Sequence, residues 1–450
     1  MASNGLKTIA GIFEGNVFRI PDYQRGYSWT EKQLDDFWED LENLSDNRMH
    51  YMGVLTLEKV EKEICSKTEQ WEDDRWLAEG KGYKPFYIVD GQQRLTTIII
   101  LIQTIIEKLK DNEELNYTSK EEILKKYIFQ TKDKGEGISK TFIFGYEKDN
   151  PSYEFLKTKI FNSFSTANQE IETLYTANLE FAKDFFQKKI KKLSFEDIEV
   201  LFKKVTQSLK FNVYEIEEDL DVFMAFETMN NRGKNLSNLE LMKNRLMYLS
   251  TIFKSDQYGK DSLRKNINDV WKIIYEYLGK NKADPLDDDD FLKNHWIMYF
   301  NYSRETANEY INFLLGKHFT VKNLLQDKIS MGDIQEYITS MQNSVKIWYH
   351  IHNANNSEYE NEIKKWLIKL MNLNFGAFAP LIMAILYRID SLKQDEVVDI
   401  LKTMERYIFL IFIISRRPSN VGNSKFYGFA KKFYLNFSIP HPLAVGSPAW

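Results

Sequence analysis

The feature that most constrains the fold is a direct junction between a strand and a helix, in the stretch "FYIVDGQQRLTTIII" at residues 86–100. Aromatic and β-branched residues run up to Val89 and predict a strand. Gly91 suits a tight turn, and the strongly apolar run from Leu95 predicts a helix. A strand that passes straight into such a helix indicates mixed α/β structure in this part of the chain.

The first 115 residues mix predicted strands and helices. Segments rich in aromatic and β-branched residues predict three strands, at 16–20, 51–60 and 84–89. A helix is expected to follow Thr30, because apolar residues recur on one face and Thr30 with Gln33 forms a capping-box pattern. The charged segment 61–82 is interpreted as an insertion between two strands.

Beyond residue 115 helical periodicity dominates, with one short predicted strand at 211–216. The acidic loop "ADPLDDDDF" at 283–291 indicates a boundary, and a helical bundle is expected after it. We therefore predict an α+β protein in four parts: an α/β core at 1–115, a helical continuation at 116–285, a helical bundle at 286–420, and an extended, proline-rich tail at 421–450 that fits a truncated end.

Charge and cysteine content exclude several classes of protein. The 450 residues include 60 lysines and arginines against 65 acids, so the net charge of −5 restricts any nucleic-acid surface to a local patch. Cys65 is the only cysteine, which excludes an internal disulfide and a cysteine-based zinc cluster. Because neither a secretory signal nor an apolar run of roughly 20 residues is seen, the chain is expected in the cytoplasm.

The turn after Val89 gathers polar groups suited to phosphate. Backbone amides of the turn at Gly91 and the N-terminus of the next helix converge on one point, which makes an anion site. Arg94 adds a forked cation, and Asp90 can hold hydrated Mg²⁺ or orient a water. Other side chains of this stretch can orient a water, read a base edge or donate hydroxyls to phosphate or metal: Gln92, Gln93, Thr96 and Thr97. Alternatively, Asp90 only caps the helix and Arg94 pairs with a surface acid.

A second motif, "IPDYQRGYSW" at residues 20–29, interleaves aromatic and polar side chains just before a helix. Aromatic rings stack on bases and an arginine contacts phosphate. The residues suited to this role are Tyr23, Gln24, Arg25, Tyr27 and Trp29. In the alternative interpretation the rings pack under the helix and the arginine forms a salt bridge.

A third motif, "AFETMNNRGKNLSNLELMKN" at residues 225–244, predicts a helix, a tight turn and a second helix that begins with a Ser237 and Glu240 capping box. Polar residues of the turn and of the second helix are secondary site candidates: Asn230, Arg232, Lys243 and Asn244. Taken alone, this motif is better explained as a structural turn than as a site.

Other common sites are not predicted. The segment "KGEGISKT" at 134–141 fails as a Walker A motif, because Ser139 stands where a glycine is required. His350 and His352 are two residues apart in a helical region, so they do not share a face and are poor joint metal ligands. A nucleotide would therefore have to be bound without a P-loop.

In order and content the three motifs resemble the N-terminal domain of GmrSD-type, modification-dependent restriction systems, a domain shared by SspE-like phosphorothioate-sensing defence proteins. The resemblance covers roughly residues 8–250 well and the helices up to about 417 loosely. It implies a ParB/sulfiredoxin-like α/β core followed by helices. It also implies that the Asp-Gly-Gln-Gln-Arg motif at 90–94 binds and hydrolyses a nucleoside triphosphate (GTP, ATP, CTP or UTP) with Mg²⁺. For the Tyr-Gln-Arg motif at 23–25 it implies either sensing of modified DNA or completion of the nucleotide pocket.

One departure concerns DNA cleavage. Many relatives continue into a His-Asn-His nuclease domain, whereas His441 is the only histidine beyond residue 352 here. We therefore expect no unaided cleavage of DNA, and the nuclease would be a separate subunit, a missing C-terminal domain, or absent. The oligomeric state is open, with a homodimer among the options, and no membrane partner is expected.

Together these patterns predict an anti-phage, type IV restriction-like protein that hydrolyses a nucleoside triphosphate and couples hydrolysis to sensing of modified DNA. Two alternatives stay open. A non-catalytic nucleotide- or DNA-binding sensor would regulate a separate nuclease, and a toxin-like or scaffold protein would keep the fold without the pocket. Phosphate release with and without modified DNA separates catalysis from binding.

Overall fold

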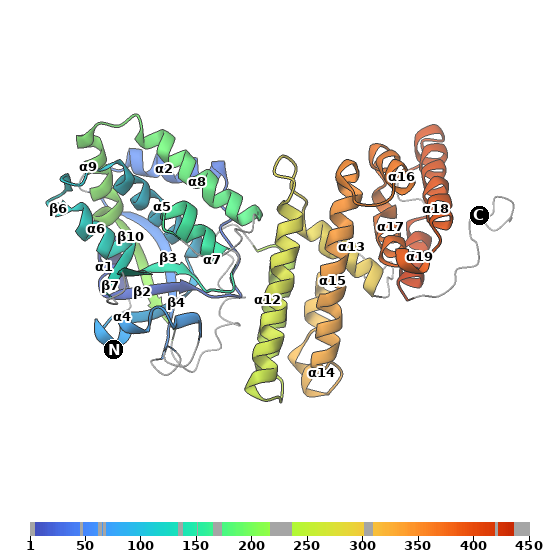
Figure 1. Ribbon diagram of the computed structural model, residues 1–450, viewed down its shortest axis with the longest axis horizontal. Coiled ribbons are helices and arrows are strands. Elements are labelled where there is room, and N and C mark those ends of the chain that lie inside the picture. The colour runs from blue at the N-terminus through green and yellow to red at the C-terminus, as the bar shows by residue number, and fades with distance from the viewer. Residues whose placement is uncertain are drawn as a thin grey trace. The chain divides into compact units, whose positions relative to one another are not determined.

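The chain divides into two units in the computed structural model, Met1–Leu236 and Ser237–Trp450 (Figure 1). The structure describes residues 5–45, 48–61, 65, 69–133, 138–150, 152–164, 173–216, 236–300, 309–418 and 422–435. We call the two parts the N-terminal unit and the helical unit. The predicted α+β class is confirmed, because a mixed sheet lies in the first unit and the second is helical.

A six-stranded mixed sheet forms the centre of the N-terminal unit, in the order β1-β10-β3-β4-β2-β9. Its strands are β1 (Gly5–Thr8), β2 (Asn16–Ile20), β3 (His50–Lys59), β4 (Lys84–Asp90), β9 (Phe144–Tyr146) and β10 (Leu209–Glu215). β2 runs parallel to β4 and β9, and β3 runs parallel to β10 but antiparallel to β4. The four strands predicted from the sequence are confirmed as β2, β3, β4 and β10.

α5 (Gln92–Lys108) is enclosed by the N-terminal unit, since all of residues 95–106 are buried. A helix that is apolar on every face has to be surrounded by protein. α8 (Leu174–Ile190) packs against α5 and against α2 (Glu31–Asn43). The capping interaction predicted for α2 is confirmed, because the Thr30 N–H donates to Gln33 Oε1 at 2.9 Å. The unit also contains α1 (Ile9–Ile12), α4 (Arg75–Gly80), α6 (Lys120–Tyr127), α7 (Ser152–Phe155) and α9 (Phe195–Lys203).

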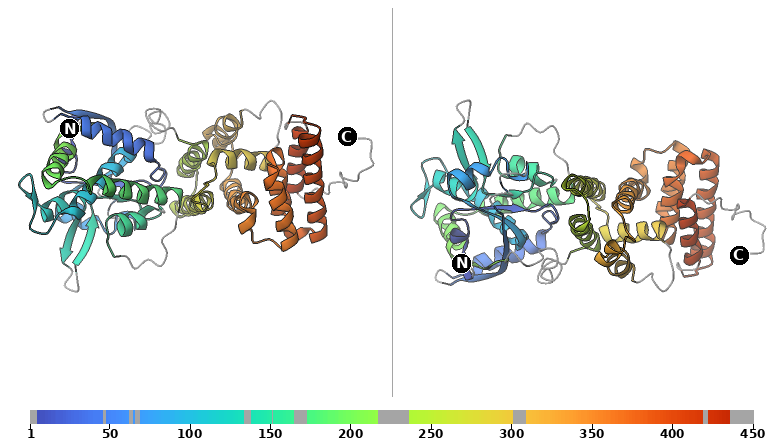
Figure 2. Two further views of the ribbon diagram at one scale, coloured as in Figure 1. Left: turned by 90° about the horizontal axis from the view of Figure 1, so that it is seen from above. Right: turned by 90° about the horizontal axis from the view of Figure 1, so that it is seen from below.

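Two antiparallel ribbons stand apart from the main sheet. β5 (Glu114–Leu115) pairs with β6 (Thr118–Ser119), and β7 (Phe129–Asp133) pairs with β8 (Ile138–Phe142). Figure 2 shows the β7–β8 ribbon projecting from the body of the N-terminal unit. Both ribbons and β9 were not predicted from the sequence, because short strands of mixed polarity give no clear two-residue periodicity.

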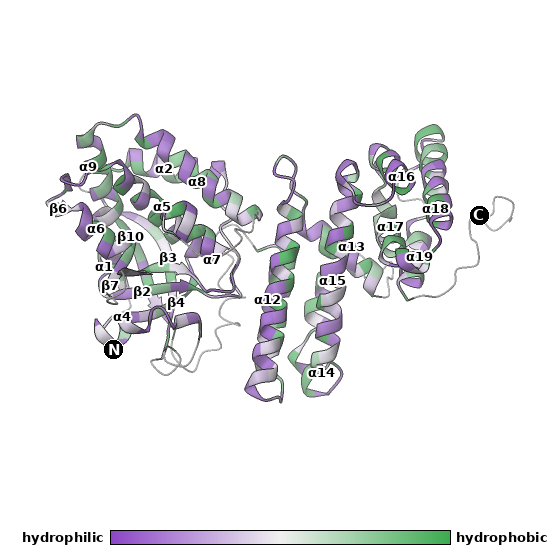
Figure 3. Ribbon diagram, in the orientation of Figure 1, coloured by the Kyte–Doolittle hydropathy of each residue, from purple (hydrophilic) through white to green (hydrophobic). Residues whose placement is uncertain are grey.

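The helical unit is a set of packed helices, in which α12 contacts α15, α16 contacts α18 and α17 contacts α19. Figure 3 shows hydrophilic and hydrophobic residues along α12, as expected for an amphipathic helix. Among the residues that the structure describes, no helix has the length and apolar character needed to cross a membrane. The longer helices are α11 (Asn238–Ile252), α12 (Gln257–Gly279), α13 (Asp288–Tyr299), α15 (Met331–His352), α16 (Asn361–Asn372), α17 (Ala379–Tyr387), α18 (Gln394–Tyr407) and α19 (Asn423–Tyr434).

The segment predicted as an extended tail from residue 421 contains α19, so that prediction is wrong for this helix. Phe426 and Ala430 lie one turn apart on α19 and are both buried, and the helix packs against α17. The prolines nearby dominated the sequence prediction, whereas the apolar spacing in "SKFYGFAKKFY" is what decides the structure. Residues 436–450 lie outside the described part of the chain.

Candidate functional site

The carboxyl ends of the parallel strands β2, β4 and β9 lie at one edge of the sheet. Polar residues stand at each of these ends: loop 21–29 follows β2, Asp90 ends β4 and residues 91–94 follow it, and Glu147 follows β9. Ligands of sheets with parallel strands bind outside these carboxyl ends. The first two sequence motifs therefore meet at an edge that suits a ligand.

Gly91 makes the turn between β4 and α5. Its φ of 94° lies in the left-handed region, and a Cβ at this position would stand 2.9 Å from Leu55 Cδ1 and 3.2 Å from the Val54 carbonyl oxygen. The Gly91 N–H donates to Oδ1 of Asp90 at 2.7 Å. The turn therefore needs glycine, and it holds the Asp90 carboxylate beside the first amides of α5, which have no acceptor within the helix.

Arg94 is bound mainly to β3. Its guanidinium donates to the carbonyl oxygens of Met52 and Val54, the latter at 2.9 Å, and lies 3.6 Å from Oδ2 of Asp90. Gly53 provides the space, since a Cβ there would overlap Nη1 of Arg94. Burial lowers the pKa of Arg94, and the charge of Asp90 opposes this shift. The guanidinium thus fixes α5 to β3, and any contact with phosphate has to use its remaining donors.

The two glutamines of the motif have different surroundings. Gln93 ties α5 to the loop, because its Oε1 accepts from the Ser28 N–H at 2.8 Å and its Nε2 donates to the Gly26 carbonyl at 2.9 Å. Gln92 is only 6% exposed, and its Oε1 has no hydrogen-bond partner among the described residues. A buried amide oxygen without a partner is costly, so Gln92 is the side chain that a ligand or an ordered water would satisfy.

The two threonines proposed as phosphate donors are used inside the protein. Thr96 Oγ1 donates to the Gln92 carbonyl at 2.7 Å, and Thr97 Oγ1 donates to the Gln93 carbonyl at 2.9 Å. The Tyr27 hydroxyl lies 2.7 Å from Thr97 Oγ1. Because each threonine hydroxyl has one hydrogen, neither can donate to a phosphate while these bonds are present.

Loop 21–29 is held between the sheet edge and α8. Gln24 Nε2 donates to the Val89 carbonyl at 2.7 Å, and Asn178 of α8 donates to the Tyr27 carbonyl at 3.1 Å. Trp29 is only partly buried. The other candidate side chains of the loop are nearly enclosed, with exposures of 5%, 2%, 7% and 0% for Tyr23, Gln24, Arg25 and Tyr27. A base could stack on these enclosed rings only after the loop opens.

A buried glutamate at the same edge was not predicted from the sequence. Glu147 is 4% exposed, and its carboxylate accepts from the Asp22 N–H at 2.6 Å and from the Tyr87 hydroxyl at 2.7 Å. It therefore fixes the start of loop 21–29 to the end of β9. The only local signal was an acid directly after a short strand, in "FGYEKDN", and that strand was itself not predicted.

Residues 7–247, more than half of the chain, match the family described as GmrSD restriction endonuclease, N-terminal domain. The chain belongs to the GmrSD family. This confirms the resemblance drawn from the motifs, and it gives the protein a role in a restriction system, which defends against phage and interacts with DNA. Comparison with curated proteins gave no match.

Asp90 is the predicted metal ligand of this chain. The Asp90 side chain is 23% exposed, and the described residues contain no group of three or more His, Cys, Asp or Glu side chains that could hold a metal ion. Mg²⁺ at phosphate sites is commonly held by one or two carboxylates together with phosphate oxygens and waters. The residues present fit Mg²⁺ that arrives with a nucleotide, and they do not form a metal site on their own.

The secondary site candidates fall only partly within the described residues. Asn230 and Arg232 lie outside the described residues. Lys243 and Asn244 belong to α11, where they are 6% and 2% exposed. The predicted cap of α11 is confirmed, since the Glu240 N–H donates to Ser237 Oγ.

Proposed function

We propose that this GmrSD-family protein binds and hydrolyses a nucleoside triphosphate with Mg²⁺ at residues 90–94, and couples turnover to sensing of modified DNA in the cytoplasm. The observation that carries the proposal is the buried, unpartnered Oε1 of Gln92 at the N-terminus of α5. A helix N-terminus attracts phosphate, and a buried amide beside it can order the water that attacks.

Each residue of the turn has a separate task in this proposal. The first amides of α5 bind phosphate oxygens, and the Asp90 carboxylate holds Mg²⁺ or accepts a proton from water. Gln92 orients the attacking water, whereas Arg94 positions the turn on β3 and lends positive charge. Bound Mg²⁺ would neutralise charge on the phosphates.

Hydrogen bonds between loop 21–29 and α5 supply the proposed coupling. Gln93 bonds to Gly26 and Ser28, so a displacement of the loop by modified DNA would also disturb the start of α5. The same bonds would transmit a change in the opposite direction when nucleotide binds, because coupling between two sites is reciprocal.

The test is phosphate release from ATP, GTP, CTP and UTP, each measured with plain and with modified duplex DNA. Replacing Asp90→Asn is expected to reduce turnover by about 100-fold or more, since it removes the charge that holds metal or activates water. Asp184→Asn on the exposed side of α8 is the matched control and is expected to keep full turnover. A folded Asp90→Asn protein with wild-type turnover would overturn the proposal.

A non-catalytic nucleotide switch is the second candidate. It is favoured by the internal bonds of Arg94, Gln93 and Thr97, which leave few side chains free for chemistry. Saturable nucleotide binding without phosphate release, with or without modified DNA, would support it.

A further inference from the structure

The β7–β8 ribbon carries two exposed lysines away from the main sheet. In the described structure β7 and β8 pair only with each other. Their base is anchored, because Thr141 Oγ1 accepts from Trp76 Nε1 at 2.8 Å and donates to the Asp73 carbonyl at 2.9 Å. Beyond this anchor, Lys132 and Lys140 are exposed to solvent.

Both lysines lie against aromatic rings. Nζ of Lys132 is 5.9 Å from the centre of the Trp76 ring, and Nζ of Lys140 is 4.4 Å from the centre of the Phe129 ring. Neither lysine forms an ion pair with a residue in the described ranges. A cation–π contact restrains an ammonium group without neutralising it, so both charges stay available to an anionic partner.

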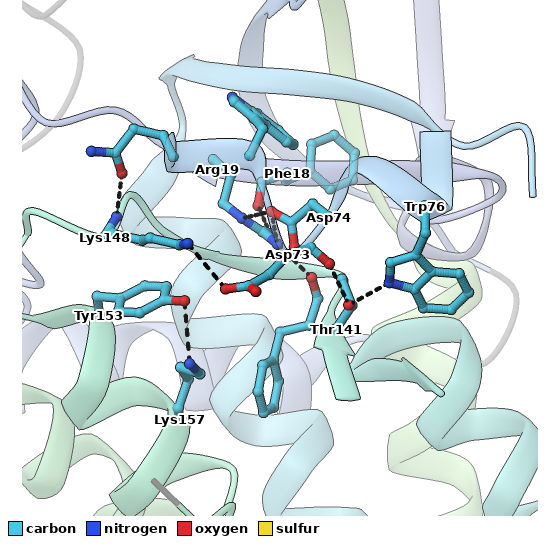
Figure 4. A network of polar contacts seen from close by, with 12 residues as sticks. Phe18, Arg19, Asp73, Asp74, Trp76, Thr141, Lys148, Tyr153 and Lys157 are labelled. Atoms are coloured by element: carbon cyan, nitrogen blue, oxygen red, sulfur yellow. Dashed lines mark hydrogen bonds and ion pairs between the residues drawn. The ribbon is translucent and has the colours of Figure 1, made fainter. Parts of the chain in front are cut away.

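The acids at the base of the ribbon are paired with other cations. Figure 4 shows this network, which lies beside Trp76 and Thr141. Its ion pairs are Arg19 with Asp74 at 2.6 Å and Lys148 with Asp73 at 3.1 Å. The carboxylates near the base are thus compensated locally, whereas the two strands of the ribbon carry Lys132 and Lys140 against one acid, Asp133.

The two lysines point to opposite faces of the ribbon. Lys132 is paired with Ser139 and Lys140 with Thr131, and neighbouring pairs in a ladder alternate between faces. The major groove of B-form DNA, about 12 Å wide, admits a two-stranded ribbon. A ribbon inserted there would present one lysine toward the phosphates of each strand.

We propose that the β7–β8 ribbon is a DNA-binding arm that enters the major groove, with Lys132 and Lys140 binding phosphates on its two sides. This rests on the proposed function for DNA as the partner, but it is independent of nucleotide hydrolysis. Duplex RNA is the less suitable ligand, because its major groove is too deep and narrow for protein side chains. The contact is with the backbone, so it does not depend on base sequence or modification.

The test is fluorescence anisotropy of a labelled, unmodified DNA duplex titrated with the full chain, without nucleotide, at several salt concentrations. Each phosphate contact contributes about 0.9 to the slope of log affinity against log salt. The variant carrying Lys132→Ala and Lys140→Ala is expected to lose about 2 from this slope and to bind about tenfold more weakly at low salt. The charge-keeping variant with Lys132→Arg and Lys140→Arg is expected to retain the slope.

Lys188→Ala on α8 is the matched control, since Lys188 is also exposed in the N-terminal unit. The proposed DNA-binding arm would be wrong if the double alanine variant kept the wild-type slope of log affinity against log salt. It would also be wrong if Lys188→Ala lost as much slope and affinity as the double alanine variant. Equal binding of duplex RNA would overturn the major-groove placement. If the wild-type chain does not bind DNA, both the DNA-binding arm and the DNA sensing in the proposed function are contradicted. Intact DNA binding by Asp90→Asn without turnover would separate the arm from hydrolysis.

Discussion

At the scale of single residues, Gln92 and Gln93 show how two identical neighbours take different roles. Gln92→Ala is expected to reduce phosphate release strongly with little change in stability, because its Oε1 has no described partner. Gln93→Ala is expected to lower the free energy of unfolding by about 1–3 kcal/mol, because it leaves buried groups of the loop without partners. Phosphate release and denaturant unfolding of both variants check this. A large stability loss in Gln92→Ala alone would contradict it.

Gly91 gives a second prediction at this scale. Gly91→Ala is expected to lower the free energy of unfolding by about 1–3 kcal/mol, because a side chain is strained at positive φ and its Cβ would press on Leu55. Gly80→Ala is the control, since a Cβ there meets nothing within 4 Å and alanine is the better helix former. Equal stability of the two variants in denaturant unfolding would show that the turn tolerates a side chain.

The sequence was informative about which residues matter in the turn, and less so about what each one does. A strand, a glycine and a polar helix start are local features, and they were recognised as a possible anion site. The separate role of each residue depends on hydrogen-bond partners far along the chain, such as Met52 for Arg94 and Gly26 for Gln93. Glu147 had no local motif, so only the folded sheet edge reveals it.

At the scale of elements, the contact between α5 and β3 tolerates little change, because it needs both the forked side chain of Arg94 and the open space at Gly53. Arg94→Lys removes the fork that bonds the two β3 carbonyls, and Gly53→Ala fills the space of the guanidinium. Each change is expected to cost about 1–3 kcal/mol of unfolding free energy. The double variant is expected to lose less stability than the sum of the two single losses, because both changes break one contact; the strain of a side chain at the Gly53 φ of 100° stays in the double variant. Strictly additive losses in denaturant unfolding would contradict the shared contact.

Elements with strong internal patterns were predicted, and elements that depend on their neighbours were missed. β2, β3, β4 and α2 have aromatic, β-branched or helical periodicity of their own. β9 has three residues and exists because β2 offers a partner strand. α19 was mistaken for an extended tail, because its apolar face is narrow and lies close to several prolines.

At the scale of the whole molecule, the helical unit is expected to be sensitive to acid. His295 is fully buried with Nε2 3.0 Å from Ser340 Oγ, and burial lowers its pKa from about 6.5 to about 3. Between about pH 6.5 and pH 3, His295 is therefore protonated in the unfolded chain but not in the folded chain. Because the unfolded state binds this extra proton, the free energy of unfolding falls as pH drops from about 6.5 toward 3. Burial also lowers the pKa of other histidines in this unit: His318, His350 and His352.

Thermal unfolding of the full chain at pH 7, 6 and 5 checks this expectation. His295→Gln keeps a polar side chain for Ser340 and does not titrate, so its melting temperature is expected to fall less between pH 7 and pH 5 than that of the wild type. His318, His350 and His352 are present in both proteins, so part of the pH dependence of the melting temperature remains in the variant. An equal or steeper fall in the variant would show that His295 is not among the groups responsible.

The position of β3 between β4 and β10 has a consequence for biosynthesis. β4 follows soon after β3 in the chain, but the other flanking strand is Leu209–Glu215. While the ribosome translates the intervening residues, the nascent chain carries β3 with one set of backbone hydrogen-bonding groups unpaired, and such an edge invites pairing with another chain. Premature termination before β10 would therefore yield an aggregating product, not a smaller working domain.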